Sequence, residues 1–321
     1  MAALRILRPG LLTTVQDSGR WGHQAQGVPV SGAMDAYSHR RANGLVGNAH
    51  DAATLEVTLM GPQVEFVEAA AIAVCGAQFR LTLDESVVPM DEIIAAESGS
   101  CLRFGERMKG ARAYLAVAGG VDVPRVLGSR STHVLTRMGG HEGRALRAGD
   151  VLPVGKEKGS GNLFLKDPGK RFPEPFSALP DGGARLRVIA GALMGELAGR
   201  RFTVSPQSDR MGYRLDGPVQ TSPGTSAELI SRPVPTGAVQ IPPAGQPILL
   251  MADHATSGGY AVAATVISAD LPVAGQLAPG DWIEFTPCSL EEADEALRVL
   301  ESSLAAFSEG SEGIEGGEGP A

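Results

Sequence analysis

The stretch TVQDSGRWGH, residues 14–23, recurs in altered form as TVSPQSDRMGY, residues 203–213. Both copies read Thr-Val, a polar cluster, and then Arg-x-Gly before an aromatic ring. The segments that follow end alike, because LRAGDV (146–151) and LAPGDW (277–282) each place a Gly-Asp turn before an apolar strand. Shared beginnings and ends predict two similar lobes produced by duplication. A chance match between short stretches is the alternative.

The rest of the chain favours strands. Its 321 residues include 42 Gly and 22 Pro, spread along the whole length, as in sandwiches and barrels built from short strands. Two helices are expected. One covers residues 34–45, with Ser31 or Asp35 near its start. The other covers residues 290–307, where Ser289 and Glu292 have the spacing of a capping box. We therefore predict a mainly β protein with two barrel lobes and few helices. The strands are expected at residues 64–67, 70–75, 79–83, 114–118, 186–190, 247–251, 261–267 and 282–285.

A polar segment rich in Pro and Gly separates the two lobes. We place the first lobe at residues 1–155, the linker at 156–184, and the second lobe with the C-terminal helix at 185–307. Residues 308–321 read SEGSEGIEGGEGPA, too polar and Gly-rich to bury a core. We expect this stretch to be a disordered acidic tail.

Composition excludes several classes of protein. The net charge is −8 and Lys and Arg form no run, so neither nucleic acid nor an anionic membrane surface is an expected partner. No apolar run is long enough to span a membrane, and the three cysteines lack metal-ligand spacing. We expect a reduced, cytoplasmic protein without a metal site. The chain has no phosphate-binding loop, and Met108-Lys109 does not fit a biotin-carrier signature. We expect no covalent biotin on this chain.

In the first lobe the candidate site residues lie on the Gly-rich loop VQDSGRWGHQAQGVPVSGAMD. It carries Gln16, Asp17, Arg20 and Asp35, whose amide, carboxylate and guanidinium groups are suited to clamping a carboxylate or ureido ligand. The alternative is that Asp17 and Arg20 form a structural pair that holds a long loop.

In the second lobe Ser208 and Arg210 belong to a compact polar cluster, while Gln240, Asp253 and Thr256 lie at the ends of apolar strands. A turn with a surface ion pair, and a turn cap at Asp253, are the alternatives. Because Arg20 and Arg210 occupy matching places in the two repeats, we predict that they share one cleft with Asp253. On this hypothesis, replacing either arginine by alanine costs activity far more than stability.

Seven motifs, in order from about residue 4 to 286, resemble one family: TVQDSGRWG, GVPVSGAMD, ANGLVGN, YLAVAGGVDVP, LGSRST, SDRMGYRL and the segment 253–260. This is the allophanate hydrolase subunit 2 group of the biotin-dependent carboxyltransferase family. The group is similar to half of the carboxyltransferase domain of urea carboxylase, and it includes the C subunit of bacterial 5-oxoprolinase. The resemblance implies cyclophilin-like β-barrels. The chain departs from the pattern at Ala255, where the family usually has Gln, and at Ala261, where it usually has Pro.

The resemblance implies one subunit of an ATP-dependent 5-oxoprolinase, which opens 5-oxo-L-proline to L-glutamate. Proteins like the A and B subunits of 5-oxoprolinase are the implied partners, and the complex uses the ATP. Asp17 or Asp253 would then move protons, and Arg20 and Arg210 would hold a carboxylate or phosphate. The remaining substrate-binding candidates are Gln16, Asp35, Ser208, Gln240 and Thr256. Two other functions remain open: a carboxyltransferase component of a biotin-dependent urea or amide carboxylase, and a non-catalytic regulator that binds a partner resembling the B subunit.

Overall fold

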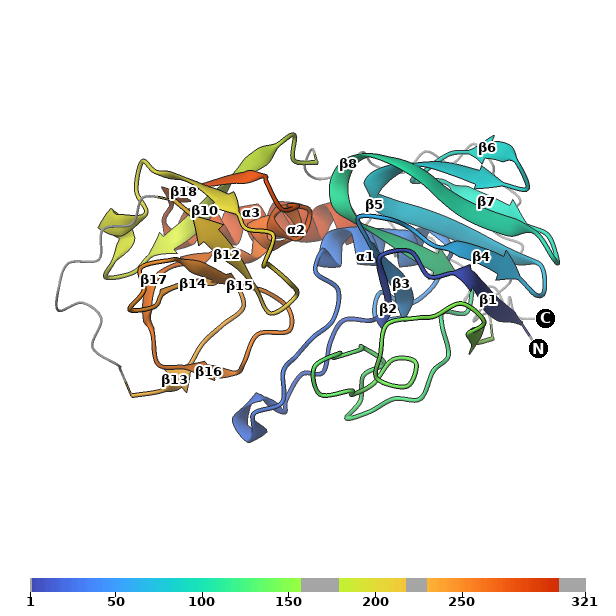
Figure 1. Ribbon diagram of the computed structural model, residues 1–321, viewed down its shortest axis with the longest axis horizontal. Helices are drawn as coiled ribbons and strands as arrows, with labels where there is room; N and C mark the ends of the chain where they lie inside the picture. The colour runs from blue at the N-terminus through green and yellow to red at the C-terminus, as the bar shows by residue number, and fades with distance from the viewer. Residues whose placement is uncertain (1, 157–178, 218–229, 306–321) are drawn as a thin grey trace, which may run out of the picture.

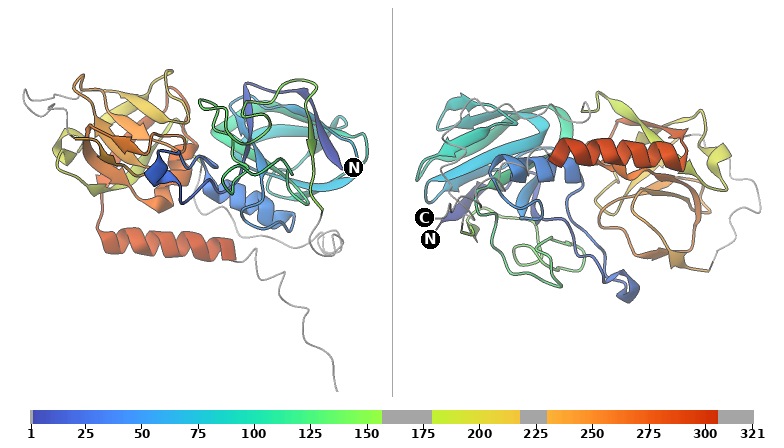
Figure 2. Two further views of the ribbon diagram at one scale, coloured as in Figure 1. Left: turned by 90° about the horizontal axis from the view of Figure 1, so that it is seen from below. Right: turned by 180° about the vertical axis from the view of Figure 1, so that it is seen from behind.

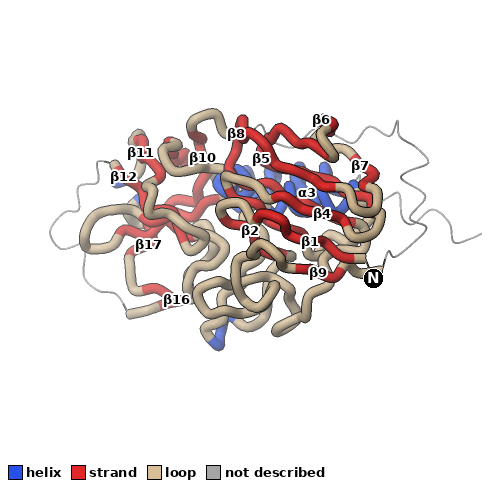
Figure 3. Tube along the Cα trace, turned by 45° about the vertical axis from the view of Figure 1, so that its right-hand side comes forward, coloured by secondary structure: helices blue, strands red, loops and turns tan. Residues whose placement is uncertain are grey.

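The computed structural model describes residues 2–156, 179–217 and 230–305. The predicted tail, and most of the predicted linker, lie outside the described residues. Two lobes rich in strands stand side by side (Figure 1), and tan loops connect the red strands in Figure 3. The prediction of a mainly β protein with two barrel-like lobes and few helices is confirmed.

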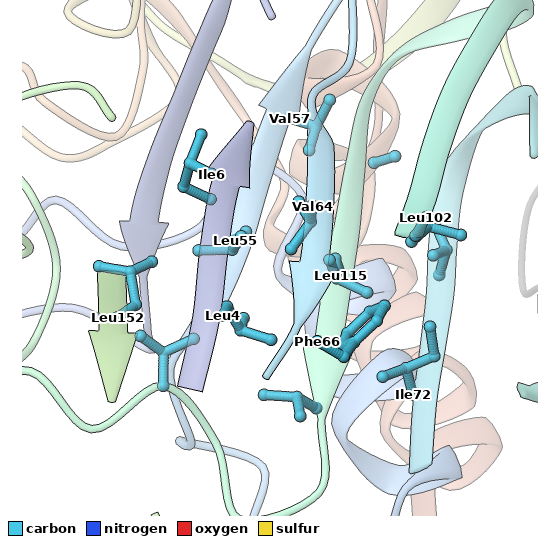
Figure 4. Close-up of a cluster of buried hydrophobic side chains, with 14 of the residues drawn as sticks. Leu4, Ile6, Leu55, Val57, Val64, Phe66, Ile72, Leu102, Leu115 and Leu152 are labelled. Carbon is cyan, nitrogen blue, oxygen red and sulfur yellow. The ribbon is translucent and has the colours of Figure 1, made fainter. Parts of the chain in front are cut away.

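The first lobe is a half-barrel. Its nine-stranded sheet has the order β2-β3-β8-β4-β1-β9, and β5 pairs with β6, β7 and β8 off this path. Side chains such as Leu4, Phe66 and Leu115 form the apolar cluster drawn in Figure 4 and are almost fully buried. The strands are β1 (Ala3–Arg8), β2 (Leu12–Gln16), β3 (Thr54–Thr58), β4 (Gln63–Phe66), β5 (Ala70–Leu83), β6 (Ser86–Val88), β7 (Ile93–Ala96), β8 (Cys101–Val117) and β9 (Val151–Pro153).

The second lobe is a closed barrel with the order β10-β17-β14-β15-β12-β11-β18. A separate two-stranded sheet, β13 with β16, lies beside it. The bounds are β10 (Gly183–Ala190), β11 (Arg201–Val204), β12 (Gly212–Asp216), β13 (Arg232–Pro233), β14 (Ala238–Ile241), β15 (Ile248–Leu250), β16 (Ser257–Gly258), β17 (Ala261–Val266) and β18 (Trp282–Pro287). Each of the eight expected strands falls within one of these elements or overlaps it. The strands expected at residues 70–75 and 79–83 are parts of one long strand, β5. The pairing of β5 with β8 becomes irregular after Gly76.

Helices occupy the junction and one face of the molecule. They are α1 (Ala36–Leu45), α2 (Leu271–Gly275) and α3 (Leu290–Ala305), with short turns η1 (Gln24–Gln26), η2 (Met194–Glu196) and η3 (Ser268–Asp270). The capping box is confirmed, because Ser289 N–H donates to Glu292 at 2.8 Å and Glu292 N–H donates to Ser289 Oγ at 3.1 Å. None of the described helices is long and apolar enough to cross a membrane.

Helix α3 follows the second lobe in the chain but extends across to the first (Figure 2). Leu300 and Leu304 are buried in the same apolar cluster as Leu45 of α1. An ion pair between Arg40 and Glu301, 2.7 Å long, lies beside this contact. The last helix therefore joins the two lobes.

Candidate functional site at the junction of the lobes

Arg210 connects the two lobes through buried ionic contacts. The turn between β11 and β12 carries it, and its guanidinium donates to both carboxylate oxygens of Asp253, at 2.9 and 3.0 Å. Its remaining donors reach Glu56 of β3 and, at 2.7 Å, the carbonyl of Gly32 in the first lobe. Burial by itself would lower the pKa of Arg210, but the charges of Asp253 and Glu56 outweigh burial and raise it. Arg210 is therefore a fully paired cation in the interior.

Glu56 extends the hydrogen-bond network from Arg210 to the residues just before α1. Its second oxygen accepts from the backbone of Met34 at 2.9 Å and from the hydroxyl of Tyr114 at 2.8 Å. Burial, with the neighbouring charges of Glu56 and Asp35, raises the pKa of Tyr114 well above its usual value, so this hydroxyl remains a donor. The Tyr114 oxygen in turn accepts from the backbone N–H of Asp35 at 2.8 Å.

Asp35 caps helix α1 and faces the second lobe. Its carboxylate accepts from the backbone and hydroxyl of Ser38, at 2.9 and 2.6 Å, and from the Gln276 amide at 2.6 Å. Burial raises the pKa of Asp35, and the charge of Glu56 adds to the rise, although the hydrogen bonds from Gln276 and Ser38 partly offset it. A buried carboxyl with a raised pKa is a typical candidate for proton transfer.

Gln276 projects from the end of α2 onto the long antiparallel strand pair β5 and β8 of the first lobe. Its Oε1 accepts from the backbone N–H groups of Ala111 and Arg112, at 3.0 and 3.1 Å, and its Nε2 donates to the Arg112 carbonyl at 2.8 Å. A Cβ at Gly110 would lie 2.7 Å from Gln276 Oε1, and one at Gly76 would lie 2.5 Å from the Arg112 carbonyl. The glycines of these two strands therefore leave room for the glutamine side chain.

A cavity of about 410 Å³ opens beside this contact. Small-molecule sites commonly occupy about 300–1,000 Å³. Asp35 and Gln276 form part of its wall, so the buried network and the cavity share residues. The other lining residues are Tyr37, Ser38, Arg41, Gly76, Gln78, Asp91, Lys109, Leu179, Pro180, Pro272 and Val273.

Two cations of the first lobe line the cavity. Arg41 of α1 is paired with Asp91, with 3.2 Å between the charged atoms. Lys109 of β8 lies 3.8 Å from Asp181, whose side chain is almost fully exposed to solvent. So exposed a partner holds a lysine weakly. Lys109 is therefore the cation of this cavity best placed to bind an incoming anion.

The candidate residues of the first loop lie away from this cavity. Asp17 accepts hydrogen bonds from the hydroxyls of Ser129 and Ser131 and from the backbone of Gly19 and Arg130. Burial would raise the pKa of Asp17, but these donors outweigh burial and lower it. A carboxylate held in this way remains ionised and organises the loop that follows β8.

Arg20 also serves this loop. It is buried, and its guanidinium donates to the carbonyls of Val126 at 3.2 Å and Ser131 at 2.7 Å. Burial lowers the pKa of Arg20, while the charges of Asp17 and Asp253 act in the opposite direction. Gln16 donates to Thr14 and to the Thr132 carbonyl, at 3.0 and 3.1 Å, and joins the same loop to β2.

The candidates of the second lobe have local contacts. Ser208 Oγ accepts from the backbone of Arg214 at 3.0 Å and closes the turn before β12. Gln240 is buried, and a Cβ at Gly258 would lie 2.6 Å from its amide nitrogen, so it lies beneath β16. The carbonyl of Thr256 accepts from Val234 at 3.1 Å. Of the nine residues predicted to form the site, Asp35 lines the cavity.

The predicted arrangement of Arg20, Arg210 and Asp253 is found in part. Arg210 and Asp253 are bonded to each other, and the charge of Asp253 acts on Arg20. Yet the donors of Arg210 go to Glu56, Asp253 and Gly32, so the group stabilises the junction instead of facing a ligand. The repeat identified both arginines, but the partners of Arg210 come from a distant strand. The described residues contain no group of three or more side chains arranged to hold a metal ion.

Sequence reasoning missed most of the residues that line the cavity. Gln276 belongs to no motif, and Glu56 of the adjoining network lies in an ordinary strand pattern. Lys109 is recognisable in the sequence as an unsuitable biotin carrier. Its one usable signal is that it is a cation beside Gly110.

The family model described as "Carboxyltransferase domain, subdomain A and B" matches residues 26–287. The C subunit of the 5-oxoprolinase of Escherichia coli (strain K12) is 40% identical over 302 residues, which are 90% of this chain and 93% of that protein. The urea amidolyase of Saccharomyces cerevisiae is 35% identical over 91% of this chain but 17% of its own length. The crystal structure of the K. lactis urea amidolyase superposes with a TM-score of 0.84 and 32% identity, covering 95% of this chain and 20% of that one. The chain thus spans about a fifth of these amidolyases.

Proposed function

Since this chain belongs to the carboxyltransferase domain family of subdomains A and B, we propose that it is the C subunit of an ATP-dependent 5-oxoprolinase assembly. Support comes from the 40% identity to the Escherichia coli C subunit, which extends over nearly the whole of both chains. The assembly would open 5-oxo-L-proline to L-glutamate, with ATP bound by the other subunits. The junction cavity is the place in this chain for the small cyclic substrate.

The chemistry of the cavity suits an acidic lactam. The substrate carboxylate would meet the ammonium group of Lys109. Opening the ring adds water across the C–N bond, so the carbonyl carbon gains a hydroxyl and the nitrogen gains a proton. Asp35 has a raised pKa and lines the cavity, and it would supply that proton. Coupling to ATP hydrolysis would drive the opening of the resonance-stabilised amide.

A carboxyltransferase component of a biotin-dependent urea or amide carboxylase is the second candidate. The TM-score of 0.84 to the K. lactis urea amidolyase favours it. Carboxybiotin would then be supplied by another protein.

Co-purification distinguishes the two functions. We expect the chain, co-expressed with proteins of the same genome that resemble the A and B subunits of 5-oxoprolinase, to form a complex that releases L-glutamate and ADP from 5-oxo-L-proline and ATP. The purified chain alone should release neither. Turnover of urea with bicarbonate and a biotin carrier, without glutamate formation, would establish the second candidate. Robust turnover by the isolated chain would contradict the proposal that it works only in a complex.

Lys109→Met is expected to raise the KM of the complex for 5-oxo-L-proline by at least about tenfold, because a hydrogen bond between charged groups is lost. Steady-state kinetics measures this change. Arg103→Met is the matched control, since Arg103 is an exposed cation of the same strand that does not line the cavity. A KM within about twofold of wild type for Lys109→Met would remove this lysine from the site.

A further inference from the structure

Large apolar side chains are exposed at three tips of the first lobe's loops. Trp21 is 66% exposed and Leu135 is 71% exposed, and Leu127 is also exposed. The tips belong to two loops, residues 17–33 and 122–146, which lie side by side in Figures 1 and 2. We call Trp21, Leu127 and Leu135, with the neighbouring Val126 and Val134, the loop-tip face. Single exposed apolar residues are ordinary, but a group on adjacent loops is typical of a binding surface.

Hydrogen bonds within and between the two loops hold the loop-tip face rigidly. Buried Arg20 precedes Trp21 and donates to the carbonyl of Val126, so it ties one loop to the other. The Trp21 indole donates to the Ser18 carbonyl at 2.9 Å. Paired backbone hydrogen bonds between His133 and Met138, at 2.8 and 3.1 Å, close the turn that carries Leu135. A surface fixed in this way loses little entropy on binding.

The backbone at these tips is strained. Leu127 has φ of 50° and Arg137 has φ of 54°, the left-handed region that costs a non-glycine residue about 1–2 kcal/mol. A turn with negative φ at Leu127 and Arg137 would avoid this backbone strain. The hydrogen bonds of Asp17 and Arg20 to this loop maintain the exposed arrangement. The chain therefore holds Leu127, one of the apolar tips, in solvent at a cost in backbone strain.

The charges beside the tips indicate what kind of surface fits. Arg125 and Arg137 are exposed, and within the described part of the chain neither side chain makes a hydrogen bond or an ion pair. Apolar anchors with arginines at the edge match a partner whose apolar surface has an acidic rim.

We propose that the loop-tip face binds a second protein through an apolar surface with an acidic rim, and that this protein is another subunit of the assembly. The inference rests on the proposed function for the identity of the partner. Trp and Arg are the residues that most often dominate binding energy at such contacts. The face lies apart from the lining of the junction cavity, so docking there leaves that cavity open.

The test is assembly with the co-expressed partner subunits, measured by affinity purification and titration calorimetry. Leu135→Asp should weaken binding on the order of 30-fold, the effect of removing an interface anchor. Val87→Asp is the matched control, because Val87 is also 71% exposed but lies in β6, far from these loops in Figure 1. It should bind as wild type does. Arg125→Glu with Arg137→Glu should also weaken binding, and thermal melting should show both chains folded.

Each outcome bears on one of the two proposals or on both. Wild-type affinity for Leu135→Asp would overturn the loop-tip face while leaving 5-oxoprolinase activity intact. Weakened binding of Leu135→Asp to a complex without that activity would support the face and overturn the proposed function. A wild-type chain that binds none of the partner subunits would overturn both. If Leu135→Asp instead abolished self-association or binding to phosphatidylserine vesicles, a second copy or a membrane would be the occupant, and the proposal would be wrong.

Discussion

Arg210→Met should lower the free energy of unfolding by about 3–5 kcal/mol, the usual cost of removing one partner from a buried ionic network. Glu56 and Asp253 would stay behind as buried carboxylates without their shared cation. Urea denaturation measures the loss. Arg298→Met is the control, because Arg298 and Glu295 form an exposed pair on α3 that is expected to contribute less than about 1 kcal/mol.

The loss in Arg210→Met should also depend on pH. Without the arginine, two buried carboxylates repel each other and lack a counter-charge. Adding protons neutralises carboxylates and so removes this repulsion. The deficit relative to wild type should therefore shrink as the solution is acidified. An undiminished stability combined with lost activity would instead restore Arg210 as a ligand-binding residue in a shared cleft.

Gln276→Leu is the second change with a large expected effect. Leucine keeps the side chain's bulk but leaves the N–H groups of Ala111 and Arg112 without their acceptor in a buried contact. Each buried unsatisfied group costs about 1–3 kcal/mol, so we expect a loss of about 2–4 kcal/mol in urea denaturation. Asp35 would also lose a hydrogen bond that lowers its pKa, so the pKa of Asp35 should rise further.

A matched variant checks that the effect belongs to the junction. Gln246 donates to Asp216 at 2.6 Å in an exposed pair on the barrel, so Gln246→Leu should change stability by less than about 0.5 kcal/mol. Equal losses in the two variants would show that the Gln276 contact is not specifically stabilising. A Gln276→Leu chain as stable as wild type would mean that water replaces the amide.

Local features of the fold are readable in the sequence. The capping box at Ser289 and the N-cap at Asp35 act within one helical turn, and short apolar strands are bounded by turn residues. Closure of the second sheet into a barrel follows from the repeat and the family resemblance. The sequence does not predict that the sheet of the first lobe stays open as a half-barrel. That property depends on how β5 and β8, which are distant in sequence, pair with each other.

The site is less predictable because its members come from distant segments. Glu56 sits in an apolar strand, where a lone glutamate looks like a solvent-facing residue, yet it is buried beneath Arg210. Gln276 follows a small helix with no distinguishing pattern. Their roles come from the docking of one lobe on the other, which no local pattern encodes. Arg20 and Arg210 stand out because their motif repeats, but the two arginines have different kinds of partner: carbonyls for Arg20 and chiefly carboxylates for Arg210.

Helix α3 has a consequence for biosynthesis. The apolar cluster that contains Leu45 of α1 is completed by Leu300 and Leu304, which the ribosome makes long after α1. The helical face of the half-barrel therefore stays partly uncovered until α3 has been synthesised. Contacts so distant in sequence form slowly, and exposed apolar surface invites aggregation in the meantime. A nascent chain stalled before residue 290 should need chaperone protection, and a premature stop there should yield an insoluble product instead of a soluble pair of lobes.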